Sequence, residues 1–309
     1  MKKHIFFFGM VSFILISVTN CKKKSSDPSE VKESAVAGST TILVDETIFP
    51  IVEDMAILFE NEYKRAKINL ISKSENEIIK MIQDDKSRIA ILAKTLDSTE
   101  IKYYNNTKKV YPRITEFGAD AIAFIGNATA KDSTIVLNEV LDVLKGNGNS
   151  KIKTLVFDNP NSSTVRELKN LAGIKELPKQ NVFSVNSNKE AIKYVTENEG
   201  AVGVIGINWL LQPTSDLTAY IPKIKVLAVE NVKVNEKNKF FKPNQTNIAD
   251  GSYPVTRKLY MLNFQGATGL GMGFASYIAG QQGQRILLKS GLVPKHFPTR
   301  QIAVRNGIE

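Results

Sequence analysis

Short apolar runs rich in β-branched residues alternate with helical patterns along the chain from residue 40 onward. Continuous apolar runs predict strands, and apolar residues that recur every three or four positions predict helices. We expect strands at residues 41–44, 67–72, 88–93, 119–126, 154–157 and 201–207, and helices at 50–63, 75–83, 137–144, 162–171 and 187–199. This alternation predicts an α/β fold with mostly parallel sheets.

Several predicted helix ends carry residues typical of helix caps. Pro50 suits the first turn of a helix, and Ser187 followed by Glu190 has the spacing of a capping box. Glycine follows three predicted helices, at Gly146, Gly173 and Gly200. Residues 230–253 contain few such signals, and we expect a loop-rich segment there.

The first twenty residues have a different pattern, that of a secretory signal peptide. Lys2 and Lys3 precede an apolar stretch at 5–16 that is too short to span a membrane stably. Cys21, the only cysteine, follows at the position of the lipid-modified residue of a lipoprotein. We therefore expect a signal peptide at 1–20 and a polar, lipid-anchored tether at 21–39.

This reading of the leader places the protein in the cell envelope, as a periplasm-facing lipoprotein held in the membrane through the lipid on Cys21. Two alternatives explain the same cysteine without a lipid. It is a buried free thiol, or the signal peptide is a plain one that is cleaved elsewhere.

Composition limits the classes of function. The chain has 309 residues, 42% of them hydrophobic, and a formal net charge of +10, which suits a globular protein of about two lobes. One cysteine excludes an intrachain disulfide or a cysteine-based metal cluster, and two histidines exclude a histidine-rich metal site. His4 lies in the leader, so catalytic imidazole chemistry would depend on His296 alone. We expect no enzyme, no metal and no cofactor.

The basic balance does not by itself indicate nucleic-acid binding. The lysines and arginines are scattered along the chain, and it contains no zinc-finger, basic-zipper or RNA-binding signature. A net positive surface suits small anions or membrane lipid equally well. We expect no nucleic-acid partner.

Two predicted strand-to-helix junctions carry polar groups. One spans 44–50 and contains Thr47, and the other spans 157–164 and contains Ser162 to Thr164. In open parallel sheets, ligands bind at the carboxyl ends of strands, where helix N-termini also point. Hydroxyl groups beside free backbone N–H groups can cradle an anion. Ordinary helix capping explains the same residues without a ligand.

Five short segments follow one another in a recognisable order. They are Thr47-Ile48-Phe49-Pro50, Ser162-Ser163-Thr164, Asn198-Glu199-Gly200-Ala201-Val202-Gly203-Val204, Tyr253-Pro254-Val255-Thr256-Arg257 and Gly283-Gln284 through Gly291-Leu292-Val293-Pro294. Together they cover about residues 40–300. In this order they resemble the substrate-binding proteins of phosphate ABC transporters, which are type II periplasmic binding proteins.

The resemblance implies two α/β lobes with a ligand cleft and two hinge crossings, near residues 120–125 and 259–264. Lobe 1 would contain residues 40–121 and 263–309, and lobe 2 residues 122–262. It implies a monomer that binds phosphate or a similar small oxyanion and delivers it to an ABC transporter permease. The ligand-binding residues expected from the junctions and the resemblance are Thr47, Ser72, Ser74, Ser162, Ser163 and Thr164.

The chain departs from the family's phosphate site at three positions. The family has an aspartate after its third strand, and none stands at that place, residues 93–95, here. Asp158 stands where the family has an arginine, and Ser163 where it has a glycine. A compensating cation would come from Lys73, Lys94 or Arg257, and a compensating proton acceptor from Asp45 or Glu46. We therefore expect weaker phosphate affinity or a less charged ligand.

The sequence is compatible with three functions. The first is a lipid-anchored solute-binding protein that captures phosphate or a related oxyanion for an ABC-type transporter. The second is a binding-protein scaffold without a transport role, acting as an envelope sensor or interaction module. The third is a secreted hydrolase with His296 as its base, which is less supported because a histidine between prolines near a terminus is typical of a surface loop. The glycines within 266–273 lack the Lys-Ser/Thr ending of a phosphate loop, and we expect a turn into a helix there.

Overall fold

The computed structural model describes residues 33–147, 151–231, 239–266 and 268–299. The predicted signal peptide, Cys21 and most of the predicted tether lie outside the described residues. Strand β1 (Ala37–Asp45) begins inside the segment predicted as tether, three residues before residue 40. No helix among the described residues is long and apolar enough to cross a membrane.

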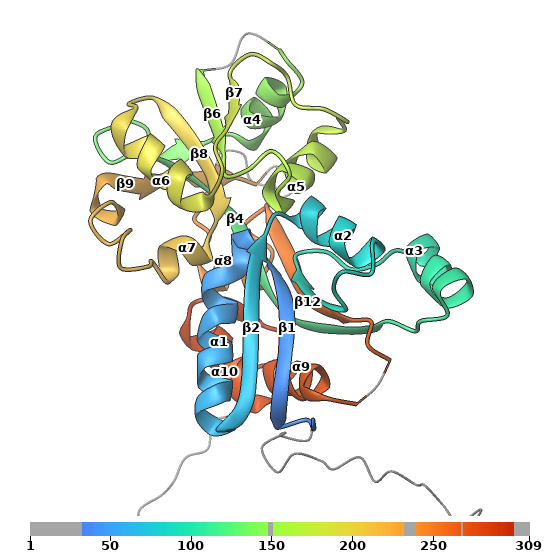
Figure 1. Cartoon of the computed structure of the whole chain (residues 1–309). Helices are drawn as coiled ribbons and strands as arrows, with labels where there is room; N and C mark the ends of the chain where they lie inside the picture. Colours follow the sequence, from blue (N-terminus) through green and yellow to red (C-terminus); the bar gives the residue numbers. More distant parts are fainter. Residues whose placement is uncertain (1–32, 148–150, 232–238, 267, 300–309) are drawn as a thin grey trace, which may run out of the picture. The chain divides into compact units, whose positions relative to one another are not determined.

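The first group of strands is parallel, as the sequence predicts. β1 lies between β2 (Arg65–Lys73) and β3 (Ile89–Leu92), with parallel pairing on both sides. Helix α1 (Phe49–Glu62) packs with Ile42 and Val44 of β1, whereas helix α2 (Glu75–Gln83) packs with Leu43. Successive side chains of a strand point to opposite faces, so the apolar run of β1 places these helices on opposite sides of the sheet (Figure 1).

A long strand, β4 (Arg113–Asn127), connects this group to the rest of the sheet. Its first part, 113–121, pairs antiparallel with β12 (Thr256–Asn263), and β12 also pairs with β3. Its second part, 122–127, pairs with β8 (Ala201–Gly206) and β9 (Ile224–Val226). The strand order is therefore β2-β1-β3-β12-β4-β8-β6-β7.

These pairings can be set beside the proposed division into lobes. Thr256 already pairs with Ala121, and the rest of β12 continues beside β4 and β3. The first proposed boundary, at residue 121, coincides with the change of partner within β4. All of β12 belongs to the ladder of the first group, whereas the second proposed boundary lies at residue 262; the division into lobes stays a prediction.

The second group of strands follows the same architecture. β6 (Thr154–Phe157) pairs parallel with β7 (Val182–Ser184) and with β8. Helices α4 (Leu137–Leu144), α5 (Ser163–Ala172) and α6 (Asn188–Glu197) bury apolar residues against these strands. All of β8 and all of β6 lie within predicted strands, at 201–207 and 154–157, so the α/β prediction is confirmed.

The capping box predicted at the start of α6 is half formed. The Ser187 hydroxyl accepts a hydrogen bond from the Glu190 backbone N–H, as predicted. The Glu190 carboxylate, however, accepts from the backbone and side-chain N–H groups of Asn186 instead of Ser187. The predicted hydrogen bond from the Ser187 backbone N–H to Glu190 is wrong, because Asn186 offers two donors to the Glu190 carboxylate.

The remaining elements are shorter. Strands β5, β10 and β11 form a separate small sheet, and the segment predicted as loop-rich contains β11 and α8. The glycine-rich turn leads into α9, as expected. The bounds are α3 (Ser98–Tyr103), a π-helical turn η2 (Tyr104–Lys108), β5 (Thr134–Ile135), α7 (Asn208–Leu211), η3 (Ile221–Lys223), β10 (Ala228–Glu230), β11 (Phe240–Phe241), α8 (Gln245–Ala249), α9 (Leu270–Ala279), α10 (Gln281–Lys289) and β13 (Val293–Pro294).

Candidate functional site

The end of β1 provides a buried carboxylate and a buried hydroxyl. Asp45 is the last residue of β1, and its Oδ1 accepts a hydrogen bond of 3.0 Å from the Thr47 backbone N–H. This contact caps the short helical turn η1 (Glu46–Ile48), which leads directly into α1 with Pro50 in its first turn. Asp45 and Thr47 are both fully buried.

The junction between β6 and α5 provides a second carboxylate and three hydroxyls. Ser162 caps α5 by accepting a hydrogen bond from the Val165 N–H. Ser162 Oγ donates to Asp158 Oδ1 over 2.8 Å, and Thr164 Oγ1 donates to the same oxygen. The predicted anion cradle therefore directs two of its hydroxyl hydrogens to a carboxylate of its own chain.

A cross-strand ion pair lies between these junctions. Arg257 of β12 is the register partner of Asp120 of β4, so their side chains lie on the same face of neighbouring strands. The contact is bidentate, with Nε–Oδ1 at 3.0 Å and Nη2–Oδ2 at 2.5 Å. Arg257 is 4% exposed and Asp120 is fully buried. A bidentate pair of this kind fixes the position of the guanidinium.

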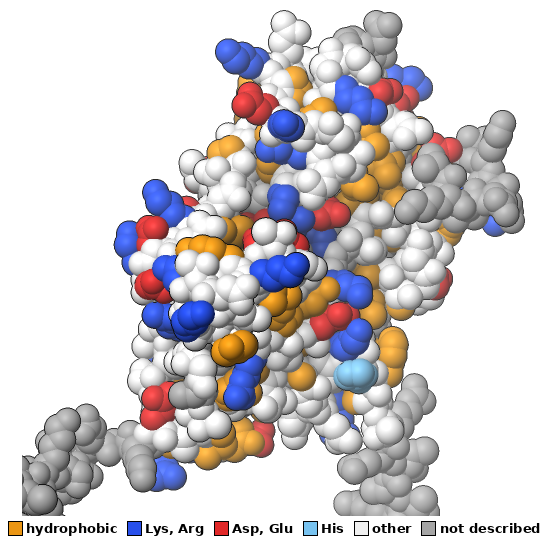
Figure 2. All heavy atoms as spheres, turned by 90° about the vertical axis from the view of Figure 1, so that its right-hand side faces the viewer, with side chains coloured by type: hydrophobic (Ala, Val, Ile, Leu, Met, Phe, Trp, Pro, Cys, Tyr) orange, Lys and Arg blue, Asp and Glu red, His pale blue; other side chains and the backbone are white. Residues whose placement is uncertain are grey.

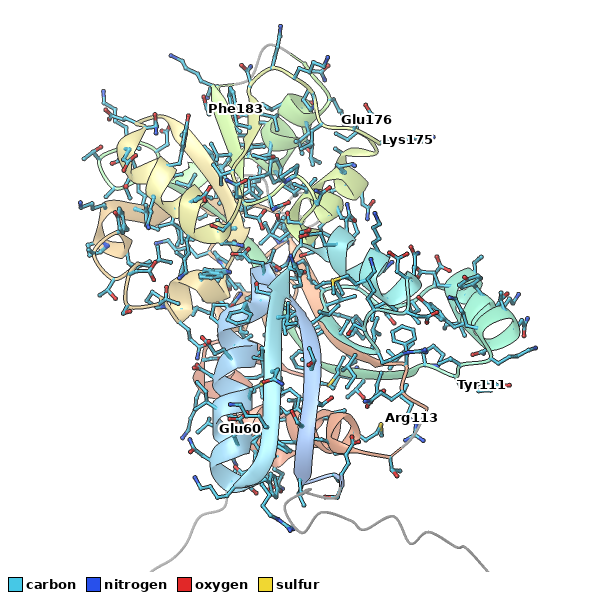
Figure 3. The ribbon with its side chains drawn as sticks, viewed as in Figure 1. Glu60, Tyr111, Arg113, Lys175, Glu176 and Phe183 are labelled. Atoms are coloured by element: carbon cyan, nitrogen blue, oxygen red, sulfur yellow. The ribbon has the colours of Figure 1, made fainter. Side chains whose placement is uncertain are left out.

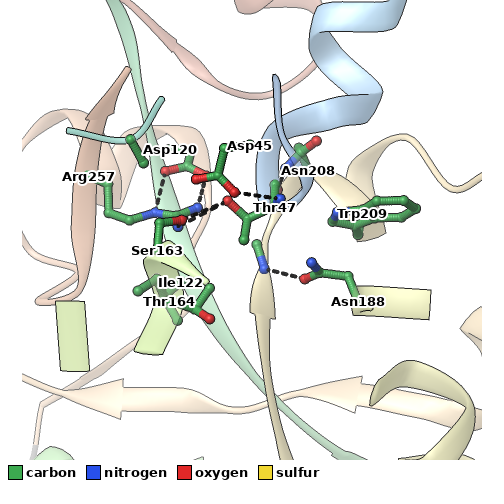
Figure 4. A network of polar contacts seen from close by, with 12 residues as sticks. Asp45, Thr47, Asp120, Ile122, Ser163, Thr164, Asn188, Asn208, Trp209 and Arg257 are labelled. Carbon is green, nitrogen blue, oxygen red and sulfur yellow. Dashed lines mark hydrogen bonds and ion pairs between the residues drawn. The ribbon is translucent and has the colours of Figure 1, made fainter. Parts of the chain in front are cut away.

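The remaining nitrogen of Arg257 joins the two junctions (Figure 4). Nη1 donates to Thr47 Oγ1 over 3.2 Å and to Ser163 Oγ over 2.7 Å, and the two hydroxyl oxygens lie 3.0 Å apart. One hydroxyl donates to the other, which leaves one hydroxyl hydrogen free for a further acceptor. Thr47 and Ser163 stand 116 positions apart in the sequence, and Arg257 brings both to one point.

Two buried acceptor atoms in this region have no hydrogen-bond partner among the described contacts. They are Oδ2 of Asp45 and Oδ1 of Asn208. Both residues are fully buried, and a buried polar atom without a partner costs about 1–3 kcal/mol. The site thus has one free hydroxyl hydrogen and two acceptors that lack a donor.

Asn188, at the start of α6, connects Asp158 to a further carboxylate, that of Glu46. Its Nδ2 donates to Glu46 and, over 3.1 Å, to Asp158 Oδ2, and its backbone N–H donates to Glu46 Oε1. Its Oδ1 accepts from the Gly206 N–H at the end of β8. One asparagine therefore connects the end of β1 to the second group of strands.

These carboxylates have altered acidity. Burial, followed by the negative charge of Asp158, raises the pKa of Glu46 from 4.5 to about 8, although the hydrogen bonds from Asn188 lower it. Burial likewise raises the pKa of Asp158 from 3.8 to about 6, against the lowering effect of its hydroxyl donors. For Arg257, burial lowers the pKa, but contact with Asp120 outweighs burial and keeps the guanidinium charged.

Other direct contacts hold the same junctions together. Asn208 Nδ2 donates to the Thr47 carbonyl over 2.5 Å, and Trp209 Nε1 donates to the Glu46 carbonyl over 3.0 Å. Gly206 has no side chain where the Thr47 carbonyl approaches, and a Cβ there would lie 2.3 Å from that oxygen. This close approach requires glycine.

A second arginine bridges α5 and α2. Arg166 Nε donates to Glu75 Oε1 over 2.5 Å, its Nη2 donates to Glu75 Oε2 over 3.3 Å, and Nη2 also donates to the Ala93 carbonyl over 3.0 Å. The Arg166 side chain is 26% exposed, whereas the Glu75 side chain is fully buried. This pair therefore lies at the edge of the buried network.

The structure brings together four of the six residues predicted to bind the ligand. Thr47, Ser162, Ser163 and Thr164 lie in one buried network. The other two, Ser72 and Ser74, have no hydrogen bond to this network among the described contacts. Ser72 is exposed on β2, and the Ser74 hydroxyl donates to Glu77 Oε2 over 2.7 Å. The ligand-binding role of all six stays a prediction.

Sequence reasoning missed three members of the network: Asp120, Asn188 and Asn208. A signal for Asp120 is present, because an aspartate within the apolar run 117–126 needs a buried cation. Arg257, one of three candidate compensating cations, is its partner. The asparagines have no comparable signal, because exposed helix starts carry the same residue. Charged residues outside the network, such as Lys175 and Glu176, are exposed and point outward (Figure 3), and charged side chains of both signs are scattered over the face shown in Figure 2.

The described residues contain no group of three or more histidine, cysteine, aspartate or glutamate side chains placed to hold a metal ion. His296 is exposed, and the contacts of the described part give it no serine partner. The carboxylates of the site instead contact hydroxyl, amide and guanidinium donors.

Comparisons with known proteins identify the family. A family model described as a PBP superfamily domain matches residues 29–282. No curated protein sequence matches the chain. A structure from Clostridium perfringens, assigned as a phosphate ABC transporter substrate-binding protein with bound phosphate, covers 84% of this chain and 100% of its own at 20% identity, with a TM-score of 0.66.

Two further structures have the same fold at lower identity. An ABC-type phosphate transport receptor from Vibrio cholerae covers 83% of this chain and 100% of its own at 16% identity, with a TM-score of 0.61. The regulatory domain of CcmR from Synechocystis PCC6803 in complex with 2-PG covers 78% and 96% at 12% identity, with a TM-score of 0.52. The predicted fold is confirmed: the protein belongs to the PBP superfamily and has the type II fold of phosphate-binding proteins.

Proposed function

We propose that this protein is a lipid-anchored solute-binding protein that captures phosphate or a related oxyanion for an ABC-type transporter. One observation carries the proposal: Arg257 Nη1, Thr47 Oγ1 and Ser163 Oγ converge, with separations of 2.7–3.2 Å. A fixed guanidinium and hydroxyl groups at helix starts are the donors that a tetrahedral oxyanion requires. Arg257 would supply the positive charge that the family's arginine supplies at the position of Asp158.

Asp45 supports a ligand that carries a proton. Its Oδ2 is buried and has no donor, while one hydroxyl hydrogen of the Thr47–Ser163 pair lacks an acceptor. Hydrogen phosphate offers both an O–H donor and acceptor oxygens, whereas sulfate at neutral pH offers only acceptors. The bound phosphate of the Clostridium perfringens structure is consistent with this ligand class.

A second candidate function is a binding-protein scaffold without a transport role, acting as an envelope sensor or interaction module. The observation that favours it is the use of the cradle hydroxyls, because Ser162 and Thr164 both donate to Asp158. An anion would have to compete with this carboxylate for the same hydrogens. The regulatory domain from Synechocystis shows that the fold also serves regulation.

The remaining parts of the proposal rest on the sequence and the family. Cys21 would carry the lipid and hold the protein in the cell envelope on its periplasmic side. A transporter permease would be its protein partner, and the protein would act as a monomer. We propose no catalytic role and no cofactor.

Calorimetry with phosphate, sulfate and molybdate on the purified protein tests the proposed ligand class. We expect phosphate to bind with a Kd below 1 mM and sulfate at least tenfold more weakly, because Asp45 Oδ2 would repel an oxyanion without a proton. Thr164→Ala removes one hydroxyl of the cradle and should change the phosphate Kd. Absence of binding below millimolar concentration, together with no effect of Thr164→Ala, would favour the interaction module.

Membrane fractionation tests the anchor independently of the ligand. Cys21→Ser should release the protein into the soluble envelope fraction, whereas the unmodified sequence should sediment with membranes. A Cys21→Ser protein that still sediments with membranes would refute the lipid anchor and leave the ligand proposal untouched.

A further inference from the structure

We propose that anion capture by this protein is coupled to proton uptake, and that the carboxylates of Glu46 and Asp158 take up the proton. The inference rests on the proposed function, since it concerns the same site. The chemical step is a proton transfer to a carboxylate oxygen when the anion arrives: an O–H bond of hydronium, or the acidic bond of a buffer acid, breaks as the carboxyl O–H bond forms, and the donor leaves as water or as the buffer base. The bound species is then an oxyanion together with at least one proton held by the protein.

The geometry that carries the inference is an imbalance of buried charge. Four acidic residues lie within one network: Asp45, Glu46, Asp120 and Asp158. Asp45, Asp120 and Asp158 are fully buried, as is Arg257 apart from 4% of its surface. Arg257 is the only lysine or arginine among the buried charged residues of the described ranges, and its bidentate contact goes to Asp120.

Glu46 and Asp158 are the two members that share a single neutral donor. Nδ2 of Asn188 donates to both carboxylates, which therefore lie close to each other. No described ion pair joins either of them to a cation. Two carboxylates held this close without a cation favour a state in which one of them is protonated. The raised pKa values of both groups agree with this geometry.

The charged groups facing this pair come from every neighbouring element. From β1, Asp45 adds negative charge, and its free Oδ2 is the buried, unpartnered atom that points to a ligand. From β12 and β4 come Arg257 and Asp120, already paired. From α2 and α5 come Glu75 and Arg166, which pair with each other, and Glu167 pairs with the same arginine. From α6 comes Lys189, which pairs with exposed Asp216. Among the described residues no cation makes a direct ion pair with Glu46 or Asp158, although the charge of Arg257 lowers the pKa of Asp158 in part.

An anion placed against Thr47, Ser163 and Arg257 adds negative charge to this network. Because like charges in a buried site disfavour the ionised form, the anion raises the proton affinity of its carboxylate neighbours further. By linkage, a site that gains protons on binding binds more tightly as pH falls. The Kd for phosphate should then increase by up to about tenfold for each unit by which the pH rises, over the pH range where binding takes up one full proton.

Calorimetry in buffers of different ionisation enthalpy measures the proton uptake directly. Phosphate is titrated into the wild-type protein at pH 7.0 and at pH 8.5, and the dependence of the observed enthalpy on the buffer gives the number of protons taken up. Because phosphate itself titrates near neutral pH, the relevant quantity is the difference between the wild type and a variant. We expect Glu46→Gln to remove about 0.5 proton or more at pH 8.5, and Asp158→Asn to do the same at pH 7.0.

Glu176→Gln is the matched control, since it makes the same change at an exposed glutamate that is labelled in Figure 3. It should reproduce the wild-type uptake at both pH values. Phosphate binding with the same proton uptake in the wild type, Glu46→Gln and Asp158→Asn would overturn the inference and leave the proposed function standing. No phosphate binding by the wild type at either pH would overturn the proposed function as well. Asp158→Asn keeps the test decisive if Glu46→Gln fails to fold.

Discussion

The two arginines that reach between distant segments differ in how their positions are fixed. Arg257 is held by strand register: it faces Asp120 directly across β12 and β4, and both groups are buried. Arg166 belongs to a helix and reaches Glu75 of another helix, with 26% of its side chain exposed. The first is part of a rigid ladder, whereas the second depends on how α5 and α2 approach each other.

The difference between the two pairs shows which of them suits recognition. Asp120 occupies only Nε and Nη2 of Arg257, so Nη1 is presented to Thr47 and Ser163 in a fixed position. Arg166 instead divides its donors between Glu75, the Ala93 carbonyl and Glu167. A preorganised donor costs little entropy to use, so Arg257 suits a ligand and Arg166 suits a bridge between helices.

Breaking the buried pair should have the largest effect on stability. Asp120→Asn leaves the Arg257 guanidinium buried without its bidentate partner, and we expect a loss of about 3–5 kcal/mol in the free energy of unfolding. Urea denaturation measures it. The double variant Asp120→Leu with Arg257→Met, which removes both charges, should recover much of this loss. A loss below about 1 kcal/mol in Asp120→Asn would show that the pair is not buried in solution.

Glu46, a carboxylate without a cation partner among the described contacts, should make the free energy of unfolding depend on pH. Since the pKa of Glu46 is raised from 4.5 to about 8, the folded state holds more protons than the unfolded state between these values. The stabilising contribution is complete below pH 4.5 and is lost as pH rises toward 8. Denaturation at pH 5.5 and 8.5 should show a decrease on the order of 3 kcal/mol, which Glu46→Gln reduces. An equal decrease in stability between pH 5.5 and 8.5 in the wild type and in Glu46→Gln would show that other groups cause it.

The Arg166–Glu75 pair, whose arginine is partly exposed, should contribute less to stability than the Arg257–Asp120 pair or Glu46. Arg166→Met leaves Glu75 buried, but burial already raises the pKa of Glu75 and water reaches the arginine, so a loss of about 1–2 kcal/mol is expected. Lys67→Met is the matched control, since it breaks the pair with Glu60 in which the lysine is 65% exposed. It should change stability by less than about 0.5 kcal/mol. Thermal or urea unfolding of both variants would show whether exposure sets the order.

Most of the fold was predictable because its periodicity is local. The apolar runs of β1, β3 and β6 and the cap residues of α2 and α5 depend on neighbours within a few positions. The two-residue strands β5 and β11 were not predictable, because each is too short to show a periodicity and is defined only by its pairing with β10. The long extension of β4 toward Arg113 likewise depends on β12, which supplies its partner.

The candidate site was predictable only in part. Thr47 and Ser162 to Thr164 stand at strand-to-helix junctions, and such junctions can be found from the sequence. The arrangement of Arg257 opposite Asp120 depends on a register between strands 137 positions apart, which no local pattern specifies. The donation of the cradle hydroxyls to Asp158 depends on side-chain conformation, which no sequence pattern specifies.

The most direct test of the account is the phosphate affinity of Ser163→Ala. Calorimetry at pH 7.0 should show a Kd at least tenfold above that of the wild type, because the variant loses the hydroxyl that Arg257 and Thr47 both contact. Ser290→Ala, whose hydroxyl donates only to the Leu287 carbonyl among the described contacts, should bind phosphate as the wild type does. Wild-type affinity in a folded Ser163→Ala protein would contradict the claim that the anion binds where Arg257, Thr47 and Ser163 meet.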